Sequence, residues 1–464
     1  MNQPSNPVKQ PSPHAAAKAE LEAVLTAHPA IAFVDAAIAD ICGTLRGKRI
    51  AVADAGKLFE SGMQIPLSLH LMDVRGEMMN PGGRGYSDGD PDGTAWPIPG
   101  TITPVWGADP PRAQMLTQLH DTKGSALAYD PRAILERVLA RFRELDLTPV
   151  AAHELEFYLL DKTRDGKGAP LPPISPRTGK REKTPSVYGI EDLNRYQGFL
   201  RALAEAASLQ RVPISAASKE YSPGQFEANL RHQSNAVAAS DHAIFLRQIV
   251  RAAALSEGLE ASFMAKPYAE GLGSGQHVHV SLLDSSGRNV FDNGTPEGSE
   301  TLRQAAGGLA ALMAESMAFF APNLNAYRRF APDMFAPVNR RWGVNNRSVG
   351  LRVPVGPSQA RRIEHRCAGA DANPYLVMAA ILAGVHHGIV NKIDPGPPAA
   401  GNVSREPDRA LPFSLEDALT RLEDAGPLAG YFGKDAISLY RETKAAELAR
   451  FKKLITAEEY EWYL

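Results

Sequence analysis

The sequence predicts an α+β protein with a small, mostly β domain followed by a larger domain in which helices and strands mix. The chain has 464 residues, of which 44% are hydrophobic, and this is enough for a large core and more than one domain. Strand-like segments dominate up to about residue 120, and long helical patterns separate the strands beyond it. Five strand-like segments also place polar residues at alternate positions, as expected of a sheet that lines a site.

The first domain is expected to contain four strands and little helix. Residues 1–20 begin with a segment rich in Pro, Gln and Asn that lacks a hydrophobic signal core, so we expect a disordered tail. A helix is predicted over Pro13–Ala27. The predicted strands are 30–40 and 44–52, joined near Gly43 as a hairpin, and 101–105 and 113–117; residues 82–94, dense in Gly, Asp and Pro, predict a loop. The pattern changes near Asp121, so the domains are expected at 21–121 and 122–464.

The second domain is expected to start with a helix over 131–145, which has proline in its first turn and an apolar face from Ile134 to Phe142. A strand over 150–160 follows. Residues 161–186 predict a loop too long to be an idle connection. Further helices are predicted over 192–207, 236–257, 300–318, 374–391, 414–425 and 434–454.

Composition excludes several functions. The net charge of −2 gives no electrostatic footprint for nucleic acid. No run of about 18 apolar residues is present, so no membrane-spanning helix is expected. Cys42 and Cys367 are the only cysteines and lie in different predicted regions. We therefore expect no disulfide, and this favours a location in the reducing cytoplasm.

Three of the five strand-like segments place charged groups on one shared face, because side chains at i and i+2 of a strand point the same way. These groups are Glu154 with Glu156, His277 with His279, and Arg362 with Glu364 and Arg366. Apolar residues such as Leu155 and Val278 point the other way, toward a core. Carboxylates favour divalent cations, and arginines favour phosphate or carboxylate. The combination predicts a metal-dependent, nucleotide-using enzyme.

Each signal also has a simpler explanation. Alternate glutamates occur on ordinary surface strands, and Glu220 and Glu227 flank a turn that could be solvated. The histidine pair follows a glycine-rich segment, Gly271–Gly275, which favours close approach to a ligand. Zinc is the rival metal, but the glutamate excess favours Mg²⁺ or Mn²⁺. Several arginines between 328 and 366 could form a solvated face, but their alternation with Val, Ile and Pro favours a cleft.

The motifs together resemble the type I glutamine synthetase superfamily, over about residues 30–464. They are HELEFYLL, KEYSPGQFE, FMAKPYAEGLGSGQHVHVS, NAYRRF, NNRSVGLRVP, RRIEHR and DANPYLVMAAILAG. The segments DICGTLRGKRI, MDVRGE and LITAEEYEWYL are similar to the γ-glutamylpolyamine synthetase branch, which includes γ-glutamylputrescine synthetases. The resemblance implies an N-terminal β-grasp domain, a catalytic domain with a curved antiparallel sheet, and a dodecamer of two stacked rings with active sites between subunits.

The resemblance also implies residue roles, with two or three Mg²⁺ or Mn²⁺ ions per site and ATP as co-substrate. Glu156, Glu220 and Glu227 match a first metal site, and Glu154, His277 and Glu364 match a second. Gly273, Arg329 and Arg366 match contacts to glutamate; Arg347, Arg352 and Arg362 match phosphate-facing arginines; His279 and Ser281 match nucleotide contacts. Arg347 and Glu364 are the expected catalytic residues.

Two departures from the ammonia-using enzymes concern the amine. Ile65 and Phe335 stand where those enzymes have acids that handle ammonium, so we expect an apolar amine pocket there. The resemblance therefore implies ATP-dependent ligation of a small amine, with putrescine as the best guess, to the γ-carboxylate of glutamate. Asp73, Glu77 and Asp333 are candidates for the base or for a second cation partner. The alternatives are an ammonia-using glutamine synthetase and a catalytically silent ring-forming protein.

Overall fold

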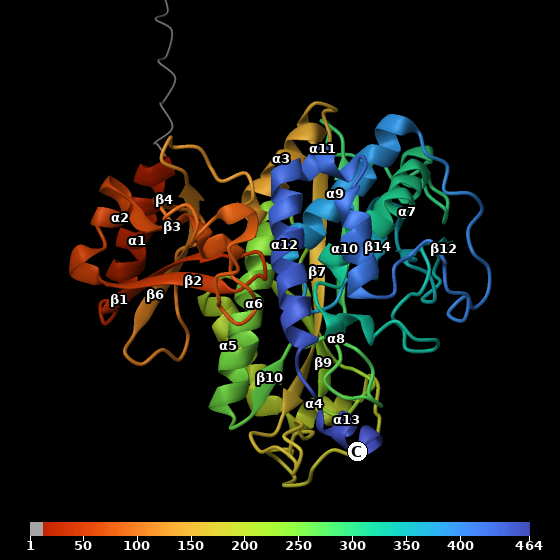
Figure 1. Ribbon diagram of the computed structural model, residues 1–464, viewed down its shortest axis with the longest axis horizontal. Coiled ribbons are helices and arrows are strands. Elements are labelled where there is room, and N and C mark those ends of the chain that lie inside the picture. The colour runs from red at the N-terminus through yellow and green to blue at the C-terminus, as the bar shows by residue number, and fades with distance from the viewer. Residues whose placement is uncertain (1–12) are drawn as a thin grey trace, which may run out of the picture.

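The computed structural model describes residues 13–464 and contains two sheets, each with its own helices (Figure 1). The smaller sheet belongs to the N-terminal domain, drawn in red and orange beside the larger domain. Its strands are β1 (Phe33–Ala39), β2 (Leu45–Ala51), β3 (Met63–Pro66), β4 (Asp92–Pro97), β5 (Thr103–Pro104) and β6 (Arg112–His120). They lie in the order β2-β1-β6-β4-β3, with β5 paired to β6. The pair β1–β6 is parallel and the others are antiparallel.

The predicted hairpin is confirmed as β1 and β2, whereas β3 and β4 were not expected. Strand β4 begins inside the predicted 82–94 loop, because pairing with β3 and β6 outweighs the weak strand propensity of its Asp, Gly and Pro residues. The helices of this domain are α1 (Pro13–Ala27) and α2 (Lys57–Glu60). Residues 13–20, expected within the disordered tail, instead form the start of α1, where Ala17 is buried in the core. Residues 1–12 lie outside the described part of the chain.

The larger sheet carries the polar strands. Its members are β7 (Thr148–Leu160), β8 (Ile214–Lys219), β9 (Gln225–Leu230), β10 (Glu260–Ser262), β11 (Gln276–Leu283), β12 (Trp342–Val344), β13 (Leu351–Val353) and β14 (Ile363–His365). Their order is β12-β13-β14-β11-β7-β9-β8, with β10 on β7. All pairs are antiparallel except β12–β13, which is parallel, so the sheet is mixed at that edge.

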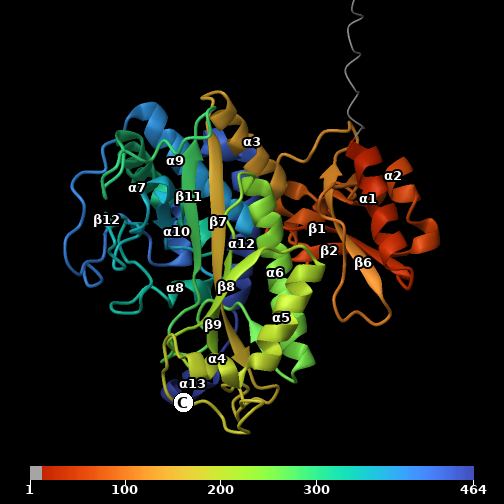
Figure 2. The ribbon, with the colours of Figure 1, turned by 180° about the vertical axis from the view of Figure 1, so that it is seen from behind.

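The helices of the larger domain bury one face of this sheet, and α9 and α12 lie behind β7 and β11 in Figure 2. The helices are α3 (Pro131–Arg143), α4 (Ile190–Arg195), α5 (Gln197–Leu209), α6 (Ala236–Ser256), α7 (Glu300–Phe320), α8 (Leu324–Tyr327), α9 (Pro374–Asn391), α10 (Leu415–Glu423), α11 (Leu428–Phe432), α12 (Lys434–Phe451) and α13 (Ala457–Tyr463). The expected helix 192–207 is two helices that meet at buried Tyr196.

Side-chain caps explain where several of these helices begin. Asp130 accepts a hydrogen bond from Arg132 N at the start of α3, and Asn235 and Ser299 cap α6 and α7. Asn373 caps α9 and also donates to the carbonyl oxygen of Asp40 at 2.8 Å. The cap of the central helix therefore also holds the N-terminal domain.

Helices α7 and α9 pack closely enough to require glycine. A Cβ atom on Gly308 would lie 2.2 Å from the carbonyl oxygen of Gly384 and 2.3 Å from the amide nitrogen of Gly388. Among residues 13–464, α9 is the one helix with the length and mean hydropathy of a membrane span, and 78% of it is buried within the protein. It is a core helix in this structure.

Candidate active site

The strand register brings the predicted polar residues together on one face of the larger sheet. His277 on β11 lies opposite Glu154 on β7, and Glu156 lies opposite Glu227 on β9. His279 lies opposite Glu364 on β14. Alternate residues of β7, including Leu155 and Phe157, are fully buried on the other face. Pleating therefore separates the polar site from the apolar core, as the alternation predicted.

Two groups of side chains in this cluster are spaced so that each could hold a metal ion. Glu154, His279 and Glu364 form one, and Glu154, Glu227 and His277 form the other; within each, the ligand atoms lie within 4.8 Å of one another. His279 Nε2 lies 2.8 Å from Glu154 Oε1, and His277 Nδ1 lies 3.6 Å from Glu154 Oε2. The second group contains three of the predicted ligands, whereas His279, expected at the nucleotide, takes part in the first.

The carboxylates of this face repel one another, and their pKa values show it. Burial, together with the charge of Glu156, raises the pKa of Glu220 to about 7. Burial and the charges of Glu154, Glu156 and Glu220 raise the pKa of Glu227 further. Burial opposes ionisation of Glu154 as well, but the neighbouring His279 and His277 outweigh it and lower its pKa. A group of acids that ionise against one another is the donor set that a divalent cation stabilises.

Buried arginines line the other side of the cluster. Arg329 and Arg366 are 2% and 4% exposed, and both have an Nε without a hydrogen-bond partner. Arg366 and Arg352 both contact Glu364, and Arg352 Nη1 lies 2.7 Å from Glu364 Oε2. These charges outweigh the burial of Glu364 and lower its pKa to about 2. Arg329 and Arg366 therefore retain buried donors that suit an anionic substrate.

The glycine-rich segment before β11 passes between these arginines and the carboxylates. A Cβ on Gly273 would lie 2.5 Å from Arg329 Cγ, and one on Gly275 would lie 3.1 Å from His277 Nε2. Gly275 N donates to Glu156 Oε2 at 2.7 Å. Only glycine fits this close approach at Gly273, and the segment places backbone groups within the site.

Three residues expected at the nucleotide, Arg362, His279 and Ser281, lie further along the same face. Arg362 Nε donates to His279 Nδ1 at 3.0 Å. The other ring nitrogen of His279, Nε2, faces Glu154. Ser281 follows His279 by two residues on β11 and so shares its side of the strand.

The segment 347–352, expected to be strand-like, forms a strand only at Leu351–Val353, because residues 345–350 make a turn.

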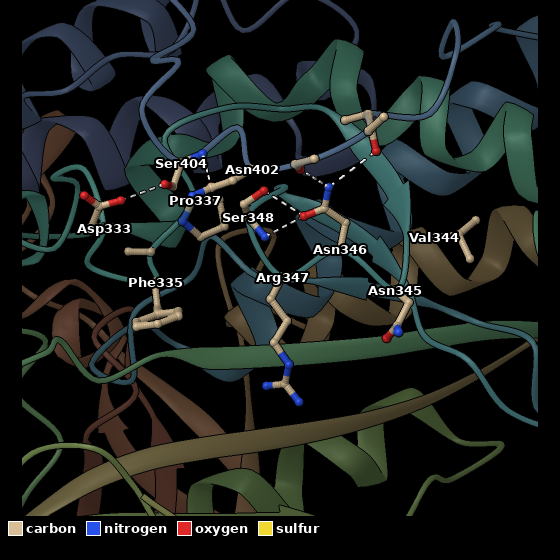
Figure 3. Close-up of a pocket in the computed structure, with 14 residues that line it drawn as sticks. Asp333, Phe335, Pro337, Val344, Asn345, Asn346, Arg347, Ser348, Asn402 and Ser404 are labelled. Atoms are coloured by element: carbon tan, nitrogen blue, oxygen red, sulfur yellow. Dashed lines mark hydrogen bonds between the residues drawn. The ribbon is translucent and has the colours of Figure 1, made fainter.

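Arg347 lies in that turn, at the wall of a cavity of about 660 Å³. Figure 3 shows its side chain extending away from the cavity wall toward two strands of the sheet. Phe335 lines the same cavity and is 62% exposed. Ile65 does not join it, since its side chain is 2% exposed in the core of the N-terminal domain. Within one chain, the two residues expected to line the amine pocket therefore lie apart, Ile65 in the core of the N-terminal domain and Phe335 at the cavity.

The three candidate bases are already engaged. Asp333 accepts hydrogen bonds from Arg405 and Ser404, and these lower its pKa. Asp73 is 1% exposed and accepts from the backbone of residues 75 and 77, and Glu77 pairs with Arg450 on α12. These partners of all three lie outside the carboxylate cluster of the larger sheet.

A buried polar chain behind the site was missed by the sequence analysis. Arg247 on α6 donates to the carbonyl oxygens of Ala370 and Ala372, and to Gln276 Oε1 at 3.1 Å. Gln276 in turn contacts His153 at 3.1 Å. Gln276 and His153 directly precede His277 and Glu154 in their strands. No local pattern marks an arginine in the middle of an apolar helix as a partner of distant carbonyl groups.

A sheet face that combines carboxylates and histidines with buried arginines defines an enzyme that brings a divalent cation together with anionic substrates. Residues 128–463 match the family model of the glutamine synthetase catalytic domain, and the chain belongs to the glutamine synthetase family. It is a glutamate–amine ligase of that family. The resemblance and fold class predicted from the motifs are confirmed.

Three relatives place the chain within the family. It is 41% identical over 446 residues to γ-glutamylputrescine synthetase PuuA of Escherichia coli (strain K12), a match that covers 96% of this chain and 94% of the relative. It is 32% identical to the glutamate–isopropylamine ligase of a Pseudomonas species, over 92% of this chain and 93% of the relative. A solved GmaS–ADP complex superposes with a TM-score of 0.82 at 26% identity, covering 97% of this chain and 99% of the other.

Proposed function

We propose that this ligase joins a small aliphatic amine, with putrescine as the best candidate, to the γ-carboxylate of glutamate through γ-glutamyl phosphate. In the first step a γ-carboxylate oxygen bonds to the terminal phosphorus of ATP and the bond to ADP breaks. In the second step the amine nitrogen bonds to the carbonyl carbon, phosphate leaves and the amine loses a proton. The convergence of buried arginines on a face of mutually repelling carboxylates is the observation that supports this chemistry most.

The carboxylate face would hold two or three Mg²⁺ or Mn²⁺ ions, and two groups of its side chains have the spacing of metal ligands. Glu156, Glu220 and Glu227 would hold one, and Glu154, His277 and Glu364 another. The fit rests on the raised pKa values of Glu220 and Glu227, which indicate more negative charge than the face can hold alone. Bound cations would neutralise charge that develops on phosphate oxygens.

The arginines would divide the anionic substrates between them. Arg366 and Arg329, with backbone groups near Gly273, would hold glutamate, because their buried Nε groups lack protein partners. Arg347, Arg352 and Arg362 would face phosphate, and His279 and Ser281 the nucleotide. Arg347 is the exposed member of this set and would stabilise the transferred phosphoryl group. Glu364 contacts both Arg352 and Arg366. It would therefore hold the phosphate-facing arginine and the glutamate-binding arginine at a fixed distance from the metal ligands.

The amine would enter beside Phe335. The cavity there offers apolar surface from Phe335, Pro337 and Val344 and neutral amides from Asn345, Asn346 and Asn402. Each buried methylene group contributes about 0.8 kcal/mol, so a four-carbon chain can offset lost ionic contacts to ammonium. The relatives named for putrescine and isopropylamine support an alkyl amine as the substrate class.

An amine panel tests the proposal. We expect kcat/KM to be highest for putrescine among putrescine, ethanolamine, isopropylamine and ammonium. The measurement is the initial rate of γ-glutamylamide formation against amine concentration, with ATP and glutamate saturating, at one pH. If ammonium is the best substrate, the protein is a glutamine synthetase in activity as well as family. If ethanolamine or isopropylamine is preferred, the ligation stands and the choice of putrescine is wrong. If no amine is ligated and no ATP is turned over with glutamate, the proposed ligation is wrong and the catalytically silent alternative is favoured.

The same proposal includes assembly and location. We infer a dodecamer of two rings with sites between subunits, in the cytoplasm, with no nucleic-acid or membrane partner. Light scattering of the purified protein tests the assembly, and a monomer would exclude it. A shared site would also allow acidic residues of a neighbouring chain to face the distal ammonium of a diamine.

A further inference from the structure

The segment Pro332–Pro337, here called the flap, forms one wall of the Phe335 cavity and is held by very few bonds. Within residues 13–464 its backbone donates a single hydrogen bond, from Met334 N to the carbonyl oxygen of Ala331 at 3.3 Å. All of its side-chain hydrogen bonds are made by Asp333. Ala336 and Pro337 at its end are buried, so the partners of the Asp333 carboxylate are what hold its more exposed part, residues 332–335.

Those partners lie on the loop formed by residues 399–406. Arg405 Nε and Nη2 donate to Asp333 Oδ2 at 2.8 and 2.6 Å, and Ser404 Oγ donates to Asp333 Oδ1 at 3.0 Å. Figure 3 shows the Asp333–Ser404 bond at the edge of the cavity. The three donors engage both carboxylate oxygens and so fix the orientation of Asp333 as well as its distance.

The 399–406 loop is itself firmly attached to the cavity wall. Asn346 Nδ2 donates to the carbonyl oxygen of Gly401 at 2.8 Å, and Val403 N donates to Ser348 Oγ at 3.0 Å. Asn339 Nδ2 donates to the carbonyl oxygen of Val403 at 3.3 Å. The loop is therefore the firmly held side of the contact, whereas the exposed part of the flap, residues 332–335, is held mainly through Asp333.

The flap backbone has a conformation that needs external support. Asp333 has φ 63° and Phe335 has φ 57°, both in the left-handed region. Aspartate tolerates this region, whereas a bulky aromatic residue rarely adopts it. Such conformations persist where surrounding contacts impose them, and they gather at sites that close on ligands. Here the imposed conformation places Phe335 at the cavity.

We propose that Asp333 and Arg405 are positioning residues for the ligase reaction, forming a latch that holds the flap and so places Phe335 against the bound amine. The inference rests on the proposed amine site. The pair is exposed, with 47% of the Asp333 side chain and 77% of the Arg405 side chain accessible, so it contributes little to global stability. Its effect is local: loss of the latch lets the flap leave the cavity, weakens amine binding and admits water to the acyl phosphate.

The test compares Arg405→Ala with Arg341→Ala in the full-length protein. Arg341 Nη1 lies 2.9 Å from Glu406 Oε2, and this pair is also about half exposed and joins the same loop without touching the flap. We expect Arg405→Ala to raise the hydrogen-exchange rate of the Met334 amide, the flap amide that donates a hydrogen bond, and the KM for the amine, each about two- to five-fold, the shift that loss of an exposed ion pair can cause. Phosphate released without amide should also increase, while Tm and the KM for glutamate match those of Arg341→Ala.

Two further variants separate charge from backbone effects. Arg405→Lys retains a cation and should recover part of the amine KM. Asp333→Asn retains the preference for left-handed φ but not the charge, and should resemble Arg405→Ala. Equal flap exchange in Arg405→Ala and Arg341→Ala would overturn the latch, and altered exchange with an unchanged amine KM would overturn its role in positioning. If the wild-type protein ligates no amine, the proposed function fails, whereas the exchange comparison still decides whether the latch exists.

Discussion

At the scale of single residues, the site depends on charges that neutralise one another only across strands. Glu364 is 2% exposed and contacts Arg352 and Arg366, and Glu227 faces three other carboxylates. Removing one charged member of such a group leaves its partners buried without compensation. Substitutions that keep shape but change charge therefore report the role of each residue most directly.

Glu227→Gln and Glu364→Gln should each lower kcat/KM by about 10²-fold or more, because each removes a carboxylate from a proposed cation site. EDTA should abolish activity in the wild-type protein, and Mg²⁺ or Mn²⁺ should restore it. Steady-state assays across metal concentrations provide the measurement. Glu260→Gln, on β10 of the same sheet but paired with Arg164, is the control and should keep its activity. Near-wild-type turnover in Glu227→Gln would refute the metal assignment.

Arg366→Lys should raise the KM for glutamate about 10- to 100-fold. Lysine keeps the charge but loses the planar fork, and a charge-assisted hydrogen bond contributes about 1.5–3 kcal/mol. The amine KM should change less. Arg340→Lys is the control, since Arg340 pairs with Asp408 at the surface. An unchanged glutamate KM would show that Arg366 does not contact glutamate.

At the scale of elements, the close approach of α7 and α9 sets the platform behind the sheet. Gly308 on α7 meets Gly384 and Gly388 on α9, and a Cβ on Gly388 would lie 2.0 Å from the carbonyl oxygen of Gln304. Backbone atoms on both sides leave no flexible side chain that could yield. The N-cap of α9, Asn373, also holds the N-terminal domain, so a shift of α9 would disturb the contact between domains.

Gly308→Ala should destabilise the protein by about 1–3 kcal/mol or more, because the added methyl group forces two helices apart. Gly430→Ala in α11 is the matched control: a Cβ there meets no atom within 4 Å, and alanine favours helix by about 0.5–1 kcal/mol relative to glycine. Thermal unfolding should therefore move in opposite directions for the two variants. A Tm for Gly308→Ala equal to or above the wild-type value would contradict the packing.

At the scale of the whole molecule, the excess of carboxylates links stability to pH and to cations. The pKa of Glu220 rises from 4.5 to about 7 on folding, and that of Glu227 also rises. A carboxyl whose pKa is raised on folding stabilises the protein below its unfolded pKa. That contribution is lost as pH rises through the folded pKa, because the ionised group is then buried beside like charges.

Mg²⁺ should therefore raise Tm more at about pH 8 than at about pH 6, since protons on Glu220 and Glu227 compete with the cation at the lower pH. Thermal unfolding with Mg²⁺ or with EDTA, at matched ionic strength, provides the comparison. Glu227→Gln should reduce the difference between the two pH values. Equal Mg²⁺-induced shifts at both would exclude these carboxylates as cation ligands.

The sequence by itself determined which residues share the polar face, because alternation along β7, β11 and β14 is a local property of strands. It also determined most of the helices and the family. Only the tertiary structure decided that Ile65 is buried in its own domain, that Arg247 holds the carbonyl groups of residues 370 and 372, and that Asp333 is bound by Arg405. Arg405 lies 72 residues from Asp333, and Asn373 lies 333 residues from the Asp40 carbonyl that it holds. Such pairs form only when distant segments pack together, and no local pattern in the chain records which segments will meet.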